Sequence, residues 1–172
     1  MIKKQEPIMN DYVITMATKK DEDQIIKLLK EVTGWLKNKE IEQWGFLAEG
    51  GEDEEIKQAI INENTYVVKK DEVLVATFTL YEAQSEWDEH IWGQSNDGAV
   101  YLHRLAVTSS EIGSRLGKGV LRWLDGLIKD KGKNKLRLDC VENNTKLNKF
   151  YFDNGFEKVG SNDGHSKFQK RV

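Results

Sequence analysis

A strongly apolar strand, a glycine-rich turn and an amphipathic helix follow one another in the middle of the chain. The strand runs over residues 99–107, the turn over 113–119, and the helix then buries Val120 and Leu121 on one face. A helix start exposes backbone N–H groups without intrahelical partners, and glycines let a ligand approach them closely. Because the helix dipole also favours negative charge there, the unit predicts a phosphate or pyrophosphate site. A simple structural turn is the competing interpretation.

Two common phosphate motifs do not fit this turn. The spacing Gly113-x-x-x-Gly117-Lys118 is one residue short of a P-loop, and Gly119 follows the lysine where Ser or Thr is required. The glycines also miss the G-x-G-x-x-G pattern, and the hairpin-like strands upstream do not suit a doubly wound sheet. Neither a P-loop nor a dinucleotide-binding fold is therefore expected.

The rest of the chain alternates between strand and helix patterns. Residues 82–98 lack clear periodicity and read as a long polar connection. The order of elements predicts a mixed α/β domain with a central sheet covered by helices. Strands are expected at 12–16, 66–68, 73–81, 99–107, 135–141, 156–159 and 166–170, and helices at 19–39, at 54–63, from 120 to about 131, and after Asn144.

The composition is typical of one globular domain. We expect residues 1–10 to form a loose leader and residues 11–172 to form the domain. The 172 residues are 38% hydrophobic and 32% charged, which is enough to bury a core. A net charge of −3 argues against a broadly basic nucleic-acid surface. The apolar runs are too short to span a membrane, and the leader has no apolar signal region. The single cysteine, Cys140, fits a reducing, cytoplasmic setting.

Two segments resemble the GNAT family of N-acetyltransferases. Leu105-Ala106-Val107 and the glycine-rich loop are similar to the family's acetyl-CoA motif, Q/R-x-x-G-x-G/A followed by a helix. The preferred register places Ile112 at the Q/R position of this motif and Arg115 and Gly117 at its two glycine positions. The alternative register runs from Ser114 to Gly119. Asn144 precedes Tyr151 by seven positions, and Tyr151-x-x-x-Gly155-Phe156 is similar to the family's N-x-x-A-x-x-L-Y-x-x-x-G-F segment. The resemblance covers residues 11–171.

The resemblance implies direct transfer of an acetyl group from acetyl-CoA to an amine. In the family the sheet is mostly antiparallel, helices cover both faces, and the fourth and fifth strands, here 99–107 and 135–141, splay apart to admit pantetheine. Tyr151 would then protonate the CoA thiolate, and Asn144 would bind pantetheine or a water on it. The implied cofactor-binding residues are Leu105, Ala106, Val107, Ile112, Gly113, Ser114, Arg115, Leu116, Gly117, Lys118, Asn144 and Tyr151.

The acceptor amine must be neutral to attack, so a general base is expected. His103 is the first candidate because its unperturbed pKa lies near neutrality, and Tyr101 shares its strand face by alternation. Acidic residues of 82–98 are the other option. Trp87 and Trp92 with Glu86, Asp88 and Glu89 could instead form a cleft for a cationic amine, or simply a solvated loop.

Several simpler interpretations stay open. Tyr151 could be only a core aromatic residue and Asn144 only a helix N-cap. The three histidines show no metal-ligand spacing, so no metal is expected. The expected partners are a small-molecule or peptide amine and, by the resemblance, a second copy of the chain in a homodimer. The rival function is a non-catalytic acyl-CoA-binding or sensor module on the same fold.

Overall fold

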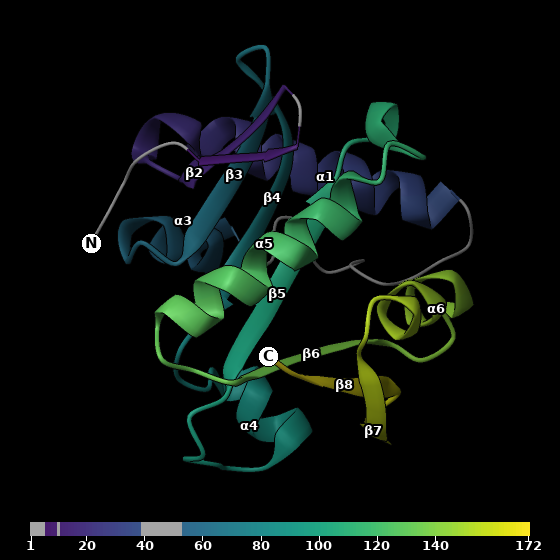
Figure 1. Ribbon diagram of the computed structural model, residues 1–172. Coiled ribbons are helices and arrows are strands. Elements are labelled where there is room, and N and C mark those ends of the chain that lie inside the picture. The colour runs from purple at the N-terminus through teal and green to yellow at the C-terminus, as the bar shows by residue number, and fades with distance from the viewer. Residues whose placement is uncertain (1–5, 10, 39–52) are drawn as a thin grey trace. The chain divides into compact units, whose positions relative to one another are not determined.

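A computed structural model of the chain describes residues 6–9, 11–38 and 53–172 (Figure 1). It falls into two compact units. The first comprises residues up to 79 together with 104–120, and the second comprises 80–103 and 121–172. None of the helices in the described part of the chain is long and apolar enough to cross a membrane.

The first unit is built on four antiparallel strands in the spatial order β1-β2-β3-β4. These are β1 (Glu6–Met9), β2 (Tyr12–Met16), β3 (Thr65–Lys70) and β4 (Val73–Tyr81). The last two residues of β4 belong to the second unit. The turn between β3 and β4 has left-handed backbone at Asp71 and Glu72, with φ of 50° and 68°. Positive φ at both central residues suits a tight hairpin, as the sequence predicts.

Two helices pack against these strands through their apolar faces. A short 3₁₀ turn, η1 (Lys19–Asp21), leads into α1 (Glu22–Asn38), and α3 (Asp53–Ile61) follows later in the chain. The core joins Ile25 and Leu29 of α1 to Ile56 and Ile60 of α3. Ala106, near the end of β5 (Val100–Val107), belongs to the same buried cluster. The strand end that the sequence assigns to the cofactor is therefore fixed by core packing.

The second unit contains the strands β5, β6, β8 and β7 in that spatial order. They are β6 (Lys135–Val141), β7 (Glu157–Asn162) and β8 (His165–Arg171), with the start of β5. β8 pairs antiparallel with both β6 and β7. β5 runs parallel to β6, but the register contains only Val100↔Leu136 and Tyr101↔Arg137. Among the described residues, β5 pairs with β6 at this end alone, as expected for strands that splay apart.

Three further helices lie in the described part of the chain. They are α4 (Glu86–Trp92), α5 (Leu116–Asp130) and α6 (Thr145–Asp153), and a 3₁₀ turn, η2 (Ser109–Glu111), precedes α5. Val120 and Leu121 of α5 are buried, as the amphipathic pattern predicts. Asn144 caps α6, which confirms the N-cap interpretation.

Three elements differ from the sequence prediction. α5 begins at Leu116, so Gly117 and Gly119, expected in the turn before the helix, lie in its first turn. The connection 82–98, read as lacking regular structure, contains α4. Its start has a capping box in which Ser85 and Asp88 bond reciprocally, so the Ser-x-x-Asp pattern was an available signal. Part of the expected loose leader, Glu6–Met9, forms β1 and pairs with β2, whereas residues 1–5 and 10 lie outside the described residues.

Candidate functional site

The end of β5 is partly buried. Ala106 is 3% exposed and its methyl group belongs to the core of the first unit, while Leu105 and Val107 are partly buried. The strand ends where the backbone N–H of Thr108 donates to the carbonyl of Val75 at 2.9 Å. These three residues can therefore take part in binding chiefly through their N–H and C=O groups.

β5 carries a backbone irregularity just before this segment. Arg104 has a φ of 53°, a left-handed conformation that is unusual for a non-glycine residue inside a strand. Its guanidinium is 8% exposed and lies 3.1 Å from the carboxylate of Glu55 on α3. The strict alternation used to place Tyr101 and His103 on one face therefore does not continue past Arg104.

The loop between η2 and α5 is closed by its own hydrogen bonds. The hydroxyl of Ser114 donates to the carbonyl of Glu111 at 2.7 Å and accepts from the backbone N–H of Leu116 at 3.2 Å. Ser114 thus ties together the loop at the start of α5. Glu111 is also fixed, because its carboxylate accepts a hydrogen bond from the hydroxyl of Tyr12.

Left-handed backbone and exposed cations mark the same loop. Gly113 and Arg115 have φ of 85° and 67°. Ile112, Arg115 and Lys118 are exposed, whereas Leu116 is buried and can contribute only its backbone. The first turn of a helix supplies unpaired N–H donors, and two cationic side chains flank this one. The loop can therefore hold a doubly charged phosphate group.

α6 places the two remaining cofactor candidates in the second unit. Asn144 is 5% exposed, and its Oδ1 accepts from the backbone N–H of Leu147 at 3.1 Å. The ring of Tyr151 is buried against Phe156 and Phe168, with centroid distances of 5.5 and 5.9 Å. Core packing of Tyr151 is thus observed, and any chemical role must come from its hydroxyl.

The phenol of Tyr151 is held in its protonated form. Burial raises its pKa well above the ordinary value, and the neighbouring Cys140 and Asp139 raise the pKa further. Burial likewise raises the pKa of the Cys140 thiol to about 12, with a smaller contribution from Asp139. Both groups are neutral across the physiological range, and Tyr151 keeps a hydroxyl proton that it can donate.

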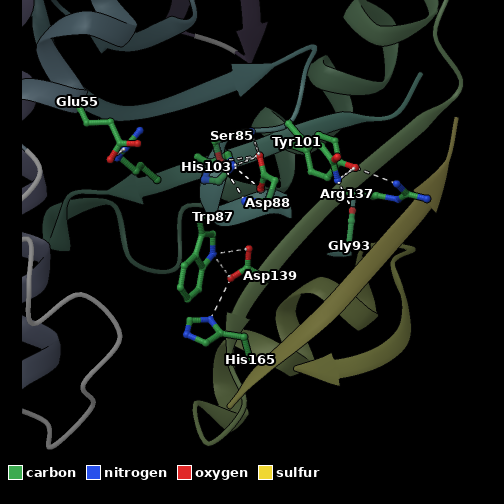
Figure 2. Close-up of polar contacts among 12 residues, drawn as sticks. Glu55, Ser85, Trp87, Asp88, Gly93, Tyr101, His103, Arg137, Asp139 and His165 are labelled. Atoms are coloured by element: carbon green, nitrogen blue, oxygen red, sulfur yellow. Dashed lines mark hydrogen bonds and ion pairs between the residues drawn. The ribbon is translucent and has the colours of Figure 1, made fainter. Parts of the chain in front are cut away.

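His103 is paired with a buried carboxylate from α4 (Figure 2). Its Nε2 lies 2.9 Å from Oδ1 and 3.0 Å from Oδ2 of Asp88, a side chain that is 1% exposed. From the sequence, His103 and the acidic residues of 82–98 are separate candidates for the general base. In the structure, His103 contacts one of these acidic residues, Asp88. Tyr101, in contrast, is 2% exposed, and its hydroxyl accepts from Arg137 at 2.9 Å and Gln84 at 3.1 Å.

A second histidine and aspartate lie around Trp87, also on α4 (Figure 2). The indole N–H of Trp87 donates to both oxygens of Asp139, at 3.2 and 3.1 Å. Nδ1 of His165 lies 2.9 Å from Oδ2 of Asp139, an ion-pair distance without hydrogen-bond alignment. Sequence reasoning missed this cluster, because its three residues come from separate elements and carry no local pattern.

The structure thus distributes the predicted site over its two units. The strand end 105–107 and the loop 112–118 lie in the first, and His103, Asn144 and Tyr151 lie in the second. Within the second unit, Tyr151 is followed by Gly155 with a φ of 90° and by buried Phe156. The Tyr-x-x-x-Gly-Phe ending therefore has a structural basis, because this turn requires the conformational freedom of glycine.

Comparison with known proteins shows the family of the chain. The profile of the Acetyltransferase (GNAT) family matches residues 27–156. The chain is 35% identical over 169 residues to the uncharacterized N-acetyltransferase YesJ of Bacillus subtilis, covering 97% of this chain and 94% of that protein.

Solved structures share the fold over almost the whole chain. A GNAT-family acetyltransferase from Listeria monocytogenes is 26% identical with a TM-score of 0.84, covering 98% of this chain and all of that one. The PaiA N-acetyltransferase of Thermoplasma acidophilum, solved in complex with coenzyme A, is 19% identical with a TM-score of 0.74, covering 94% and 99%. These matches confirm the predicted mixed α/β fold, and the chain belongs to the GNAT family of acetyltransferases.

Proposed function

We propose that this protein transfers the acetyl group of acetyl-CoA to a primary amine of a small molecule or peptide by direct attack. One observation carries the proposal beyond family membership. The second unit holds both a proton acceptor, His103 on its buried carboxylate, and a phenol, Tyr151, kept protonated by burial. Acetyl transfer needs both, since the amine must lose a proton and the thiolate must gain one.

The described residues fit the cosubstrate. Because β5 pairs with β6 only at Val100 and Tyr101, pantetheine can run along the backbone of Leu105 and Val107 in place of a strand. The pyrophosphate would be held by the start of α5 with Arg115 and Lys118. The left-handed φ of Arg115 supports the register that begins at Ile112, because its first glycine position then coincides with a glycine-like conformation. The coenzyme A complex of the PaiA relative supports the same cosubstrate.

The chemical step then balances in atoms and protons. The neutral amine nitrogen attacks the thioester carbonyl carbon, and a backbone N–H near Leu105 stabilises the oxyanion. The C–S bond breaks as the C–N bond forms. The nitrogen gives its proton to His103, which releases it to solvent. The departing thiolate is stabilised by a hydrogen bond from Tyr151 and takes its proton, and Tyr151 is reprotonated from solvent, so no net proton is gained or lost.

Free thiol release tests the proposal. The protein is incubated with acetyl-CoA and a panel of primary amines, and CoA thiol is titrated against time. Amine-dependent thiol release supports the transferase. Binding of acetyl-CoA without turnover on any amine would favour the sensor module, and absence of binding would exclude both functions. A cytoplasmic location, expected from the single free cysteine Cys140, and a homodimer remain predictions.

A further inference from the structure

The carboxylate of Asp88 contacts both Ser85 and His103. Oδ2 accepts hydrogen bonds from the backbone N–H of Ser85 at 3.1 Å and from the Ser85 hydroxyl at 3.0 Å. Nε2 of His103 lies 2.9 Å from Oδ1 and 3.0 Å from Oδ2. Ser85 therefore fixes the carboxylate against which the imidazole lies.

The buried position of Asp88 is stabilised by the start of α4. Asp88 is the third residue of the helix, where the free N–H groups and the helix dipole favour a negative charge. Its backbone N–H donates to the Ser85 hydroxyl at 3.1 Å, which completes the capping box. The carboxylate is 1% exposed, and the contacts described for it are to the start of α4 and to His103 rather than to a lysine or arginine.

This contact determines which imidazole nitrogen carries the proton. An ionised carboxylate only accepts hydrogen bonds, so Nε2 of His103 must be the protonated nitrogen. Nδ1 of the neutral ring is then unprotonated and can accept a proton. The ring is also oriented by an edge contact with Tyr81, whose ring centroid lies 5.1 Å away, and 15% of the His103 side chain is exposed.

We propose that Asp88 is the positioning residue for His103, holding it in the Nε2–H tautomer and stabilising the imidazolium formed when Nδ1 takes the proton of the amine. This inference rests on the proposed function.

The test compares Asp88→Asn with Asp163→Asn. Asp163 is a matched control because its carboxylate lies 3.0 Å from Nε2 of another histidine, His90 on α4. The Asp163 side chain, however, is 62% exposed. Asparagine also tolerates the left-handed backbone of residue 163, where φ is 50°. Asp88→Asn is expected to lower kcat about 10²-fold, leave the KM for acetyl-CoA within twofold, and alter the pH–rate profile. Asp163→Asn should leave kcat, the KM for acetyl-CoA and the pH–rate profile unchanged.

A third variant separates positioning from helix capping. Ser85→Ala removes the hydroxyl from the capping box but leaves the carboxylate and the imidazole. It is expected to lower the Tm while reducing kcat less than threefold. The ¹⁵N chemical shifts of His103 should report the Nε2–H tautomer in the wild type and in Ser85→Ala, and a changed tautomer or pKa in Asp88→Asn.

The outcomes are distinct. Wild-type turnover combined with an Asp88→Asn variant that keeps its kcat and pH profile would overturn the role of Asp88 and leave the acetyltransferase intact. Equal kcat losses in Asp88→Asn and Ser85→Ala would reduce Asp88 to a structural cap. A wild-type protein without turnover on any amine would overturn the proposed function itself, and this role with it.

Discussion

The side-chain oxygen of Asn144 accepts a hydrogen bond from the backbone of Leu147 at 3.1 Å, which closes the first turn of α6. Tyr151 lies on this same helix, so the cap also supports the proposed proton donor. Asn144→Ala should lower the free energy of unfolding by about 1 kcal/mol. Asn144→Asp keeps a capping oxygen and should retain most of that stability.

Coenzyme A affinity in the same two variants separates capping from binding. If the Asn144 amide contacts pantetheine, Asn144→Asp should bind CoA several-fold more weakly in calorimetry while remaining folded. Unchanged affinity in a stable Asn144→Asp protein would limit Asn144 to the helix cap.

Tyr151→Phe removes only the hydroxyl and keeps the ring among Phe150, Phe156 and Phe168. Because the proposed role belongs to the hydroxyl, kcat should fall about 10²-fold and the dissociation constant of CoA should stay within twofold. Steady-state thiol release and calorimetry measure the two quantities. Wild-type kcat in the phenylalanine variant would remove Tyr151 as the proton donor.

Cys140 makes stability depend on alkaline pH. Its thiol has a pKa of about 12 in the folded protein and 9.0 as the ordinary value, so above pH 9 the unfolded chain loses a proton that the folded chain keeps. Stability is unaffected below pH 9 and should fall by about 1.4 kcal/mol per pH unit between these values. Tyr151 acts in the same direction at higher pH, because its folded pKa is also raised.

Urea denaturation between pH 8 and pH 11 isolates the contribution of the thiol. Cys140→Ala should be less stable at neutral pH because a buried group is lost. The slope of its free energy of unfolding against pH should be smaller by the equivalent of about one proton. Parallel pH dependences in the two proteins would contradict the assignment.

Arg115 combines a strained backbone with a charge offered to the cofactor. Arg115→Gly and Arg115→Ala both remove the charge and should weaken CoA binding several-fold. Of the two substitutes, only glycine adopts a φ of 67° without backbone strain. Arg115→Gly should therefore be more stable than Arg115→Ala by about 1 kcal/mol. Arg122→Ala, an exposed position further along α5, serves as the charge control and should bind CoA normally.

The pair between Glu55 and Arg104 fixes the irregular part of β5 to α3. Glu55→Gln removes the charge that faces the guanidinium of Arg104, and because Glu55 is half exposed it should destabilise the protein by about 1 kcal/mol. Glu54→Gln removes an exposed charge one residue earlier, 3.7 Å from Lys57, and should change the free energy of unfolding by less than about 0.5 kcal/mol. Equal effects would mean that the pair with Arg104 contributes nothing specific.

Local patterns predicted the regular elements well, since periodicity reports directly on which face is buried. β4 and β6 have the predicted bounds, 73–81 and 135–141, and Asn144 caps its helix as expected. The short helix α4 has only two buried positions, Asp88 and Ile91, and one of them is charged. Its periodicity was therefore too weak to read, although its capping box was present.

The candidate site was less accessible to sequence reasoning because its geometry depends on tertiary structure. His103 and Asp88 are fifteen residues apart on different elements, so no local spacing joins them. The left-handed conformation of Arg104 has no compositional signal, since arginine does not favour positive φ. Trp87, Asp139 and His165 likewise meet only in the folded second unit.

The double use of Asp88 has an evolutionary consequence. Glutamate is the residue usually found at this position of a capping box, and it would serve the helix well. A longer side chain would move the oxygen that contacts His103, so aspartate suits the pair better than glutamate. Among homologues we therefore expect positions 88 and 103 to covary: where the histidine is lost, position 88 should become free to change to glutamate without harm to the helix.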